Sequence, residues 1–513
     1  MSQEQDVSHP HHPDRRRFLQ RAASMSAMGA ALPFGLNMGT LTQASAQSAG
    51  GGYKALVCLF FNGGNDAFNM VLATDSTSWG HYLHHRRPTD GSTSIALMEP
   101  GVAPVSSASG ATPERLGGVL PINHAGRSVH AGRTFALHPA LSKLQQIHNA
   151  GRACVLANVG PLTRPTSKLD YASATASKPA KLFSHNDQQS VWQSHAAEGS
   201  TVGWGGVIGD QGLLLNRAAQ ATESLSCVNL AGNAVYLAGQ QAGQFMVNPL
   251  GPDRLLALQP ANMLGSQDCV DAFKALVGTQ EPAVHRLAKE HSAIMRRAMD
   301  TNAVLLDKLS AITVPAERTQ PSGNPLADQL RTAARIMAAH RNLGAAGAAG
   351  SGGTGLRRQV FFVSLGGFDL HDNLSGQHPV LLAQLDEALA QLDTDLDALQ
   401  MRDQVTAFTA SDFGRTLSSN GDGSDHGWGS HHFVMGGAVQ GGRFWGDWPE
   451  VTDHDSGAQN IGQGRLLPTM AVDHLAEALA RWMGVSDAAA LDRIAPHRAA
   501  FAGNSPLTGL MSV

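Results

Sequence analysis

The chain of 513 residues is long enough to bury a sizeable core, either as one large α/β domain or as two domains. Its 37 Lys and Arg against 41 Asp and Glu give a net charge of −4, which supplies no basic surface for a phosphate backbone and excludes a nucleic-acid partner from our expectations. A charged fraction of 15% with 42% hydrophobic residues and 56 Gly excludes general disorder and favours buried strands joined by glycine turns.

The first 46 residues contain the three parts of an export signal. Arginines occupy positions 15–17, an uncharged run of 15 residues covers 22–36, and small residues at 44–46 offer a cleavage site. The arginines resemble the twin-arginine (Tat) signal, so we expect residues 1–46 to address a bacterial protein to the periplasm or another extracytoplasmic place. An amphipathic surface helix or an uncleaved N-terminal anchor is the alternative.

After the leader, the chain contains no run of 18 or more apolar residues. We therefore expect no integral membrane segment in the mature protein. Cys58 and Cys154 lie inside apolar runs, where free cysteine behaves as a small hydrophobe. We therefore predict that no disulfide is essential, although four cysteines could pair in an oxidising compartment.

Short apolar runs that end in glycine or aspartate are typical of buried parallel strands, and helical periodicity fills the stretches between them. The expected strands are 55–61, 153–159, 359–364, 404–410 and 432–435. The expected helices are 141–148, 281–309, 326–343, 380–399 and 470–483. This alternation predicts an α/β fold with a doubly wound, mostly parallel sheet. We expect one domain over 47–513, with a mainly helical insertion at about 215–350.

Three carboxylates stand just past expected strand ends, at Asp66, Asp369 and Asp412. Ligands of open α/β sheets bind at the carboxyl ends of the strands, so these side chains should face one crevice. For Asp66 and Asp412 the alternative is a carboxylate that caps the following turn or helix.

Several of the 23 histidines lie close to these aspartates in the sequence. They are His371 and His378 after Asp369, and His426, His431 and His432 around the last strand. Imidazole and carboxylate donors without thiolate favour zinc, manganese, iron, magnesium or calcium. His371 or His378 could instead be solvent-exposed, and His426 could have a structural role.

Ser184 and His185 begin an expected helix. Ser184 stands at the N-cap position, and a helix N-terminus binds anions readily through its free N–H groups. A metal-activated Ser184 would be a nucleophile for phosphoryl or sulfuryl transfer, with His185 beside it. The alternative is that Ser184 is a plain helix cap.

The order of these residues resembles the alkaline-phosphatase-like superfamily of phosphatases, sulfatases and phosphoglycerate mutases. That resemblance implies that Asp66 matches the first metal carboxylate and Ser184 the nucleophile. It implies that Asp369, Asp412 and His426 match the later metal ligands. Two positions depart from the pattern, because Phe413 replaces the histidine of an Asp-His pair and Asn373 stands where another histidine is expected. His371 or His378 could substitute for the latter.

Nearly the whole mature chain more closely resembles the bacterial domain-of-unknown-function family 1501. The resemblance is carried by the segments 62–66 (NGGND), 157–162 (ANVGPL), 183–188 (FSHNDQ), 366–373 (GGFDLHDN), 411–416 (SDFGRT) and 425–429 (DHGWG). The family is largely uncharacterised, so these motifs say little about a substrate.

Together these features predict an exported metal-dependent hydrolase acting on small phosphate or sulfate esters. Its expected catalytic residues are Ser184 and His185, and its expected metal ligands, for zinc, manganese, calcium or magnesium, are Asp66, Asp369, His371, Asp412 and His426. Arg415 is a candidate contact for the anion. The expected partners are the Tat machinery and a small anionic ester.

Two alternatives stay open. The loss of histidine at position 413 favours a catalytically degenerate member that binds another exported protein. An oxidoreductase with an organic cofactor is suggested by Tat export alone, because the sequence has neither a dinucleotide-binding glycine motif after a strand nor a haem-attachment motif.

Overall fold

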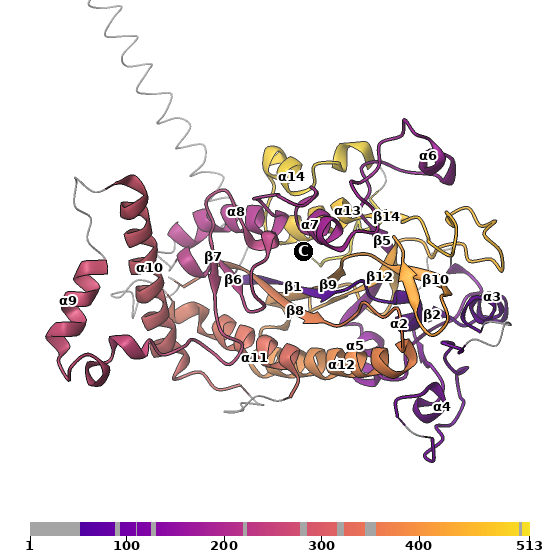
Figure 1. Cartoon of the computed structure of the whole chain (residues 1–513), viewed down its shortest axis with the longest axis horizontal. Helices are drawn as coiled ribbons and strands as arrows, with labels where there is room; N and C mark the ends of the chain where they lie inside the picture. The colour runs from indigo at the N-terminus through magenta and orange to yellow at the C-terminus, as the bar shows by residue number, and fades with distance from the viewer. Residues whose placement is uncertain are drawn as a thin grey trace, which may run out of the picture. The chain divides into compact units, whose positions relative to one another are not determined.

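The computed structural model describes residues 52–87, 93–108, 110–124, 130–218, 223–277, 285–314, 323–343, 355–501 and 505–512. Within these residues a nine-stranded mixed sheet crosses the molecule in the order β13-β5-β12-β9-β1-β8-β6-β7, with β14 paired to β5 (Figure 1). Its strands are β1 Lys54–Asn62, β5 Ala153–Gly160, β6 Cys227–Asn229, β7 Gln244–Met246, β8 Arg358–Gly366, β9 Val405–Ser411, β12 Ser430–Met435, β13 Phe444–Trp445 and β14 Met470–Ala471.

The centre of the sheet is parallel. Strand β1 pairs in parallel with β8 on one side and with β9 on the other, and β6 pairs in parallel with β8 and β7. Strand β12 runs antiparallel to both β9 and β5. The five runs expected as strands coincide with β1, β5, β8, β9 and β12, so the direction of β12 is the main departure from a parallel arrangement.

Helices cover both faces of the sheet (Figure 1). One face carries α5 (Ser142–Asn149), α11 (Pro325–Ala338) and α12 (Leu374–Ala398). The other carries α7 (His185–Ser194), α8 (Trp204–Ala218), α13 (Val472–Trp482) and α14 (Ala488–Ile494). The other helices are α2 Ala67–Met70, α3 Ser76–Arg86, α4 Pro113–Leu116, α6 Lys168–Ala172, α9 Gln267–Val277 and α10 Arg286–Leu309.

Helix α12 begins six residues before the expected start at position 380 and contains Pro379. Proline usually marks a helix start because it lacks an N–H group, which is why the sequence pattern stops there. The added first turn is held by packing, because Leu374 is buried in a small cluster with Ile95 and Leu370.

The segment expected as a helical insertion, about 215–350, also contributes to the main sheet. It contains α9, α10 and α11, but also β6 and β7, which extend the sheet beyond β8. Residues 53–513 form one compact unit, so this segment belongs to the domain and is not an appendage. Strands of three residues are too short to show a clear periodicity, which is why the sequence did not indicate them.

Two smaller sheets lie outside the main one. A hairpin of β10 (Arg415–Ser419) and β11 (Ser424–His426) places Arg415 opposite His426. The other small sheet has the order β2 (Val71–Ala73), β4 (Phe135–Leu137), β3 (Leu120–Ile122). The hairpin thereby brings Arg415 and His426 to the edge of the main sheet where β1, β8 and β9 end.

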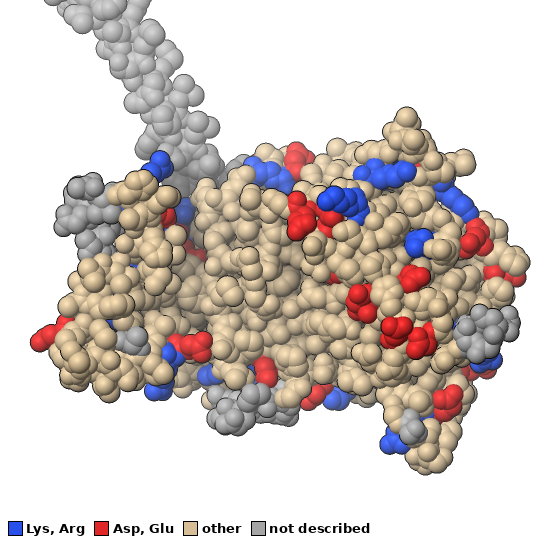
Figure 2. Space-filling view, in the orientation of Figure 1, with Lys and Arg blue, Asp and Glu red and all other residues tan. Residues whose placement is uncertain are grey.

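Charged side chains are sparse on the surface shown in Figure 2, where Lys, Arg, Asp and Glu occur singly or in small mixed groups. No broad basic area is visible among the described residues of this face. In the described part of the chain, no helix combines the length and the hydrophobicity that crossing a membrane needs. The four cysteines all lie in described segments, and all are free.

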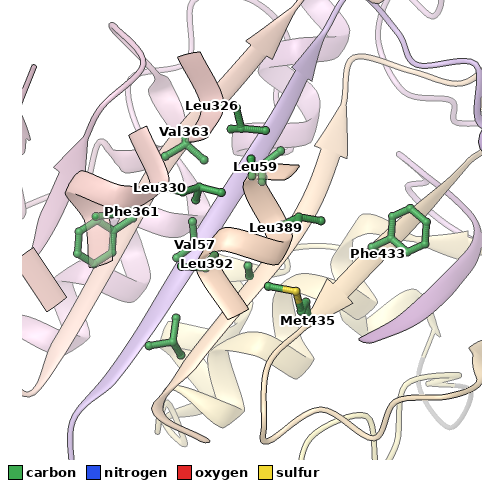
Figure 3. Packing of buried hydrophobic residues seen from close by; sticks show 14 of the residues in the cluster. Val57, Leu59, Leu326, Leu330, Phe361, Val363, Leu389, Leu392, Phe433 and Met435 are labelled. Carbon is green, nitrogen blue, oxygen red and sulfur yellow. The ribbon is translucent and has the colours of Figure 1, made fainter. Parts of the chain in front are cut away.

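The core has two layers, one on each face of the sheet. Alternate residues of β1 point to opposite faces, as in any strand, so that Val57 and Leu59 pack in one layer while Cys58 and Phe60 pack in the other. In the first layer, shown in Figure 3, β1 lies beneath leucines of α11 and α12 such as Leu330. Burial on both faces explains why the central strands read as continuous apolar runs.

Candidate metal centre

Three parallel strands end at one edge of the sheet and bring their loops together. Asn62 at the end of β1 lies opposite Gly366 at the end of β8, and β9 pairs with the other side of β1. The loops touch, since Gly63 N donates a hydrogen bond to Asp412 Oδ2 at 3.2 Å. Gly63 has a φ of +117°, and a Cβ atom there would lie 2.4 Å from Asp369 N. Only glycine allows this close approach.

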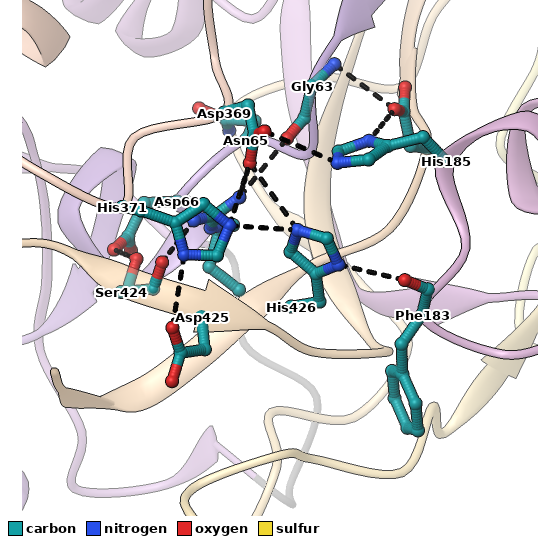
Figure 4. Close-up of polar contacts among 12 residues, drawn as sticks. Gly63, Asn65, Asp66, Phe183, His185, Asp369, His371, Ser424, Asp425 and His426 are labelled. Atoms are coloured by element: carbon teal, nitrogen blue, oxygen red, sulfur yellow. Dashed lines mark hydrogen bonds and ion pairs between the residues drawn. The ribbon is translucent and has the colours of Figure 1, made fainter.

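Three histidines direct Nε2 toward the carboxylate of Asp369 (Figure 4). His371, in the loop after β8, lies 3.1 Å from Asp369 Oδ1, and His426, at the end of β11, lies 3.4 Å from the same atom. His185, the first residue of α7, lies 3.4 Å from Asp369 Oδ2. Four side chains from three segments, namely the loop after β8, the start of α7 and the end of β11, therefore lie around one carboxylate.

The second nitrogen of each imidazole, Nδ1, faces an oxygen that can only accept a hydrogen bond. The pairs are His185 with Asp412 Oδ2 at 2.7 Å, His371 with Asp425 Oδ1 at 3.1 Å, and His426 with the Phe183 carbonyl at 2.8 Å. Nδ1 therefore carries the hydrogen in all three rings, which leaves Nε2 of each neutral ring as a lone pair. Such outer acceptors are the usual means by which proteins orient metal-binding histidines.

His371 Nε2 and His426 Nε2 lie only 3.0 Å apart. Since both rings donate through Nδ1, neither neutral ring has a hydrogen left to share, and two lone pairs face each other. A proton on one of the two rings, or a cation between them, removes this repulsion. In a tetrahedral zinc site with bonds of about 2.1 Å, ligand atoms are roughly 3.4 Å apart. His185, Asp369 and His426 each offer one ligand atom within 4.8 Å of the others, and His371 lies beside Asp369 and His426.

Arg415 neutralises Asp369 from the protein side. The side chain of Arg415 is fully buried. Its guanidinium lies 2.5 Å from Asp369 Oδ1 and also donates hydrogen bonds to the carbonyls of Gly63 and Ser424. Burial raises the pKa of Asp369, but the hydrogen bond and charge of Arg415 outweigh burial, so the pKa lies below its ordinary value. Because Arg415 is buried and engaged, it does not stand free to contact an anion.

The histidines at the site differ in their affinity for protons. The hydrogen bond that His185 donates to Asp412 raises the pKa of His185 above its ordinary value. Burial lowers the pKa of His426. A metal ion that binds at His185 therefore has to displace a proton that is held more tightly than in an ordinary histidine, whereas His426 holds its proton less tightly.

The site is open on one side. The side chains of Asp369 and His371 are 45% and 40% exposed, whereas Asp412 behind them is fully buried. On the enclosed side, the ring of Phe413 packs against His185 and His426 with centroids 4.8 and 4.5 Å away. A site with protein ligands on one side and solvent on the other suits catalysis better than a closed structural role.

Asp66, expected as a ligand, has a different environment. Its carboxylate forms a buried two-point ion pair with Arg86, at 2.6 and 2.9 Å, and accepts a hydrogen bond from Ser424. It also caps α2 by accepting from Asn69 N, the role given above as the alternative. The sequence offered no local signal for Arg86, which lies in a cluster of basic residues on α3.

Asp412 and Ser184 lie beside the histidines rather than among the facing atoms. Asp412 acts through His185 and also accepts from Gln189 at 3.0 Å. Ser184 stands at the N-cap position of α7, but its hydroxyl makes no capping bond and donates to Asp187 Oδ2 at 2.9 Å. His185, expected as a catalytic group, has the position of a metal ligand.

The remaining histidines near the expected site are core residues. His378 is fully buried, bonds to Asn65 and has its pKa lowered by burial to about 4. His431 stacks on Trp448 at 4.1 Å, and His432 lies beside Trp192 at 4.9 Å. Of the two histidines that could replace the one missing at position 373, only His371 reaches Asp369.

Comparison with known proteins gives one strong match. The sequence model of the family described as "Protein of unknown function (DUF1501)" matches residues 53–494. No curated protein matches. A solved crystal structure of Ps i-CgsB matches with 10% identity over 71% of this chain and 72% of that chain, at a TM-score of 0.30. Ps i-CgsB in complex with k-i-k-neocarrahexaose matches with 8% identity over 88% and 76%, at 0.32. At these TM-scores neither structure carries an argument.

Proposed function

This chain belongs to the DUF1501 family, and we propose that its three-histidine site is the metal centre of a hydrolase that acts on phosphate or sulfate esters. The observation that carries the proposal is the pair of facing Nε2 atoms of His371 and His426, 3.0 Å apart with both Nδ1 atoms committed as donors. We further propose zinc or manganese as the ion, since imidazole-rich sites with one carboxylate suit these metals better than calcium or magnesium.

When bound, a divalent ion supplies Lewis-acid chemistry that polarises the ester oxygen and makes a water molecule a better nucleophile. His185, His371, His426 and Asp369 would hold the ion. Asp412 and Asp425 keep their histidines in the ligating tautomer. The N-terminal end of α7, which begins at His185, lies beside the site and favours an anionic substrate.

Water is a better candidate than Ser184 for the nucleophile. The Ser184 hydroxyl donates its hydrogen to Asp187, whose carboxylate is nearly buried and also accepts from Glu198 N. A serine held in this way would first have to break that bond and rotate. In Ser184→Ala we expect hydrolysis to continue within about tenfold of the wild-type rate, whereas loss of a nucleophile costs far more.

We also propose that the protein is related to the alkaline-phosphatase-like superfamily and is exported by the Tat route. The superfamily placement is supported by the chain order of Asp369, Asp412 and His426 at strand ends. The export proposal rests on the arginines at 15–17, which lie outside the described residues. Export after folding would allow the ion to be bound before the protein leaves the cytoplasm.

Metal analysis of the purified full chain tests the proposal. In His371→Ala and His426→Ala we expect the content of zinc or manganese to fall by about one equivalent relative to the wild type. Hydrolysis of aryl phosphates or aryl sulfates should be lost with it. His454→Gln is the control, because its side chain is 74% exposed and outside the site. Unchanged metal content in both alanine variants, with no hydrolysis by the wild type, would refute the proposal.

A specific observation favours a second candidate, a member without catalytic activity that binds another exported protein. Phe413 stands where the resemblance to the alkaline-phosphatase-like superfamily implies a metal-binding histidine, and its ring leaves no room for more than glycine at position 64, where a Cβ would lie 2.4 Å away. A second ion beside the first therefore lacks one of its usual ligands. Co-purification of a partner that persists in His426→Ala, together with no esterase activity, would favour this candidate.

A further inference from the structure

A second group of facing donors lies at the other end of α7. His195 is the C-cap residue of this helix, Asp473 is the second residue of α13, and His497 lies just after α14. One ligand atom from each lies within 4.8 Å of the others. None of these residues takes part in the three-histidine site.

The ring orientation of His195 is that of a metal ligand. Its Nε2 donates to the carbonyl of Ile494 at 2.9 Å, so Nδ1 of the neutral ring is a lone pair. This Nδ1 lies 3.3 Å from Asp473 Oδ2. His195 has a φ of +58°, in the left-handed region that favours glycine or asparagine, so the backbone is held in an unusual conformation where the ring enters the group.

His497 presents its own Nδ1 to the same carboxylate. The atom is buried, makes no hydrogen bond in the described structure and lies 3.4 Å from Asp473 Oδ1. The backbone N–H of His497 donates to Asp473 Oδ1 at 2.7 Å, which fixes the carboxylate and leaves Oδ2 toward His195. Both nitrogen–oxygen distances are close to the roughly 3.4 Å between ligands of a tetrahedral zinc ion.

The environment requires a positive charge. The side chain of Asp473 is 1% exposed and that of His195 is 4% exposed. A buried carboxylate is costly unless it is paired, and the ion-pair partners of Asp473 among the described residues are these two histidines. The charge is therefore supplied by a protonated histidine or by a cation.

Space for a further ligand adjoins the group. A cavity of about 80 Å³ is lined by all three side chains and by Pro161, Leu162 and Thr163, among others. That volume holds a water molecule or two, which would complete four-coordination.

We propose that His195, Asp473 and His497 form a second divalent-metal site, of the zinc class, that fastens the C-terminal end of α7 to α13. The helix has ten residues and is roughly 15 Å long. It carries His185 at its first position and is followed directly by His195. An ion at the second site thus holds in place the helix that positions one ligand of the first site.

Metal content and calorimetry of the full chain test this proposal. After removal of metal with a chelator and reloading with zinc, we expect about two equivalents in the wild type and about one in His497→Gln. His497 is the best position to change because its side chain is 28% exposed, and the exposed His454→Gln is the matched control. Zinc should raise the melting temperature of His497→Gln less than that of the wild type.

The two sites can be tested separately. In His371→Gln we expect the second site to keep its zinc, so that His371→Gln with His497→Gln binds none. If only the first-site proposal fails, the wild type holds one equivalent that His497→Gln loses. If His497→Gln does not fold, zinc-edge anomalous diffraction from wild-type crystals decides the question. No anomalous peak between His195, Asp473 and His497, or an unchanged zinc content in a folded His497→Gln, overturns the proposal, and a protonated histidine then accounts for the cluster.

Discussion

Replacement of Asp412 by asparagine tests whether this buried carboxylate orients His185 toward a metal ion. Asp412 Oδ2 accepts from His185 at 2.7 Å, from Gln189 at 3.0 Å and from Gly63 N at 3.2 Å. In Asp412→Asn the shape is kept, but the charge is lost, and an NH₂ group takes the place of Oδ1, for which the described structure provides no hydrogen-bond partner.

The expected cost follows from these contacts. Weakening of the outer partner of a metal-binding histidine, here by replacing a charged acceptor with a neutral one, typically lowers metal affinity by ten- to a hundredfold, which is about 1.4 to 2.7 kcal/mol. The pKa of His185 should also fall toward its ordinary value, because the hydrogen bond that it donates to the Asp412 carboxylate is the largest cause of its elevation. Near neutral pH the variant should therefore release fewer protons on zinc binding than the wild type.

Zinc titration by calorimetry in two buffers of different ionisation enthalpy measures both effects, and competition with a chelator extends the affinity range. Asp425→Asn is the matched control, since Asp425 stands behind His371 in the same way but its side chain is 45% exposed. Water can replace much of that contact, so we expect less than about a tenfold loss there. Wild-type affinity in Asp412→Asn, or a larger loss in Asp425→Asn, would refute the reasoning.

Three further predictions concern stability. Gly64→Ala should lower the unfolding free energy by about 1 to 3 kcal/mol in denaturant titrations, because φ is +79° and the new Cβ would meet the ring of Phe413; an unchanged midpoint would contradict this. Arg415→Lys should cost about 1 to 2 kcal/mol, discounted because its partner Asp369 is 45% exposed, and equal stability of the two proteins would show that the guanidinium geometry is unimportant. Burial lowers the pKa of His432 to about 3, so the unfolded state binds the proton first and stability falls as the pH drops from about 6.5 toward 3. His432→Phe should remove part of this fall, on the order of 4 kcal/mol across the window, and identical acid-unfolding curves would contradict it.

The strand ends were the part of the site that the sequence could indicate. An apolar run followed by glycine and aspartate is a local pattern, and it placed Asp369 and Asp412 at one edge because parallel strands share that edge. Local patterns do not show which way a side chain turns, however. Asp412 turns toward His185, and Asp66 turns toward Arg86 of α3.

The contacts that decide the site join residues far apart in the chain. His185 meets Asp412 across 227 positions, and His195 meets Asp473 only because α7 and α13 pack on the same face of the sheet. The direction of β12 also depends on packing, because a short buried strand reads the same in either orientation. One sequence on its own contains no signal for such pairings.

The position of β1 in the middle of the sheet has a consequence for how the protein folds. This first strand pairs with β8 and β9, which lie roughly 300 residues or more further along the chain. Contacts between segments so far apart in the sequence slow folding. During synthesis its two edges stay unpaired until β8 and β9 have emerged, so the nascent chain depends on protection against aggregation. Asp369 follows β8 and His426 follows β9, so both can meet His185 only when most of the chain is available. Metal capture is therefore a late event in folding, and a chain truncated before β11 would lack His426 and offer an ion no complete site.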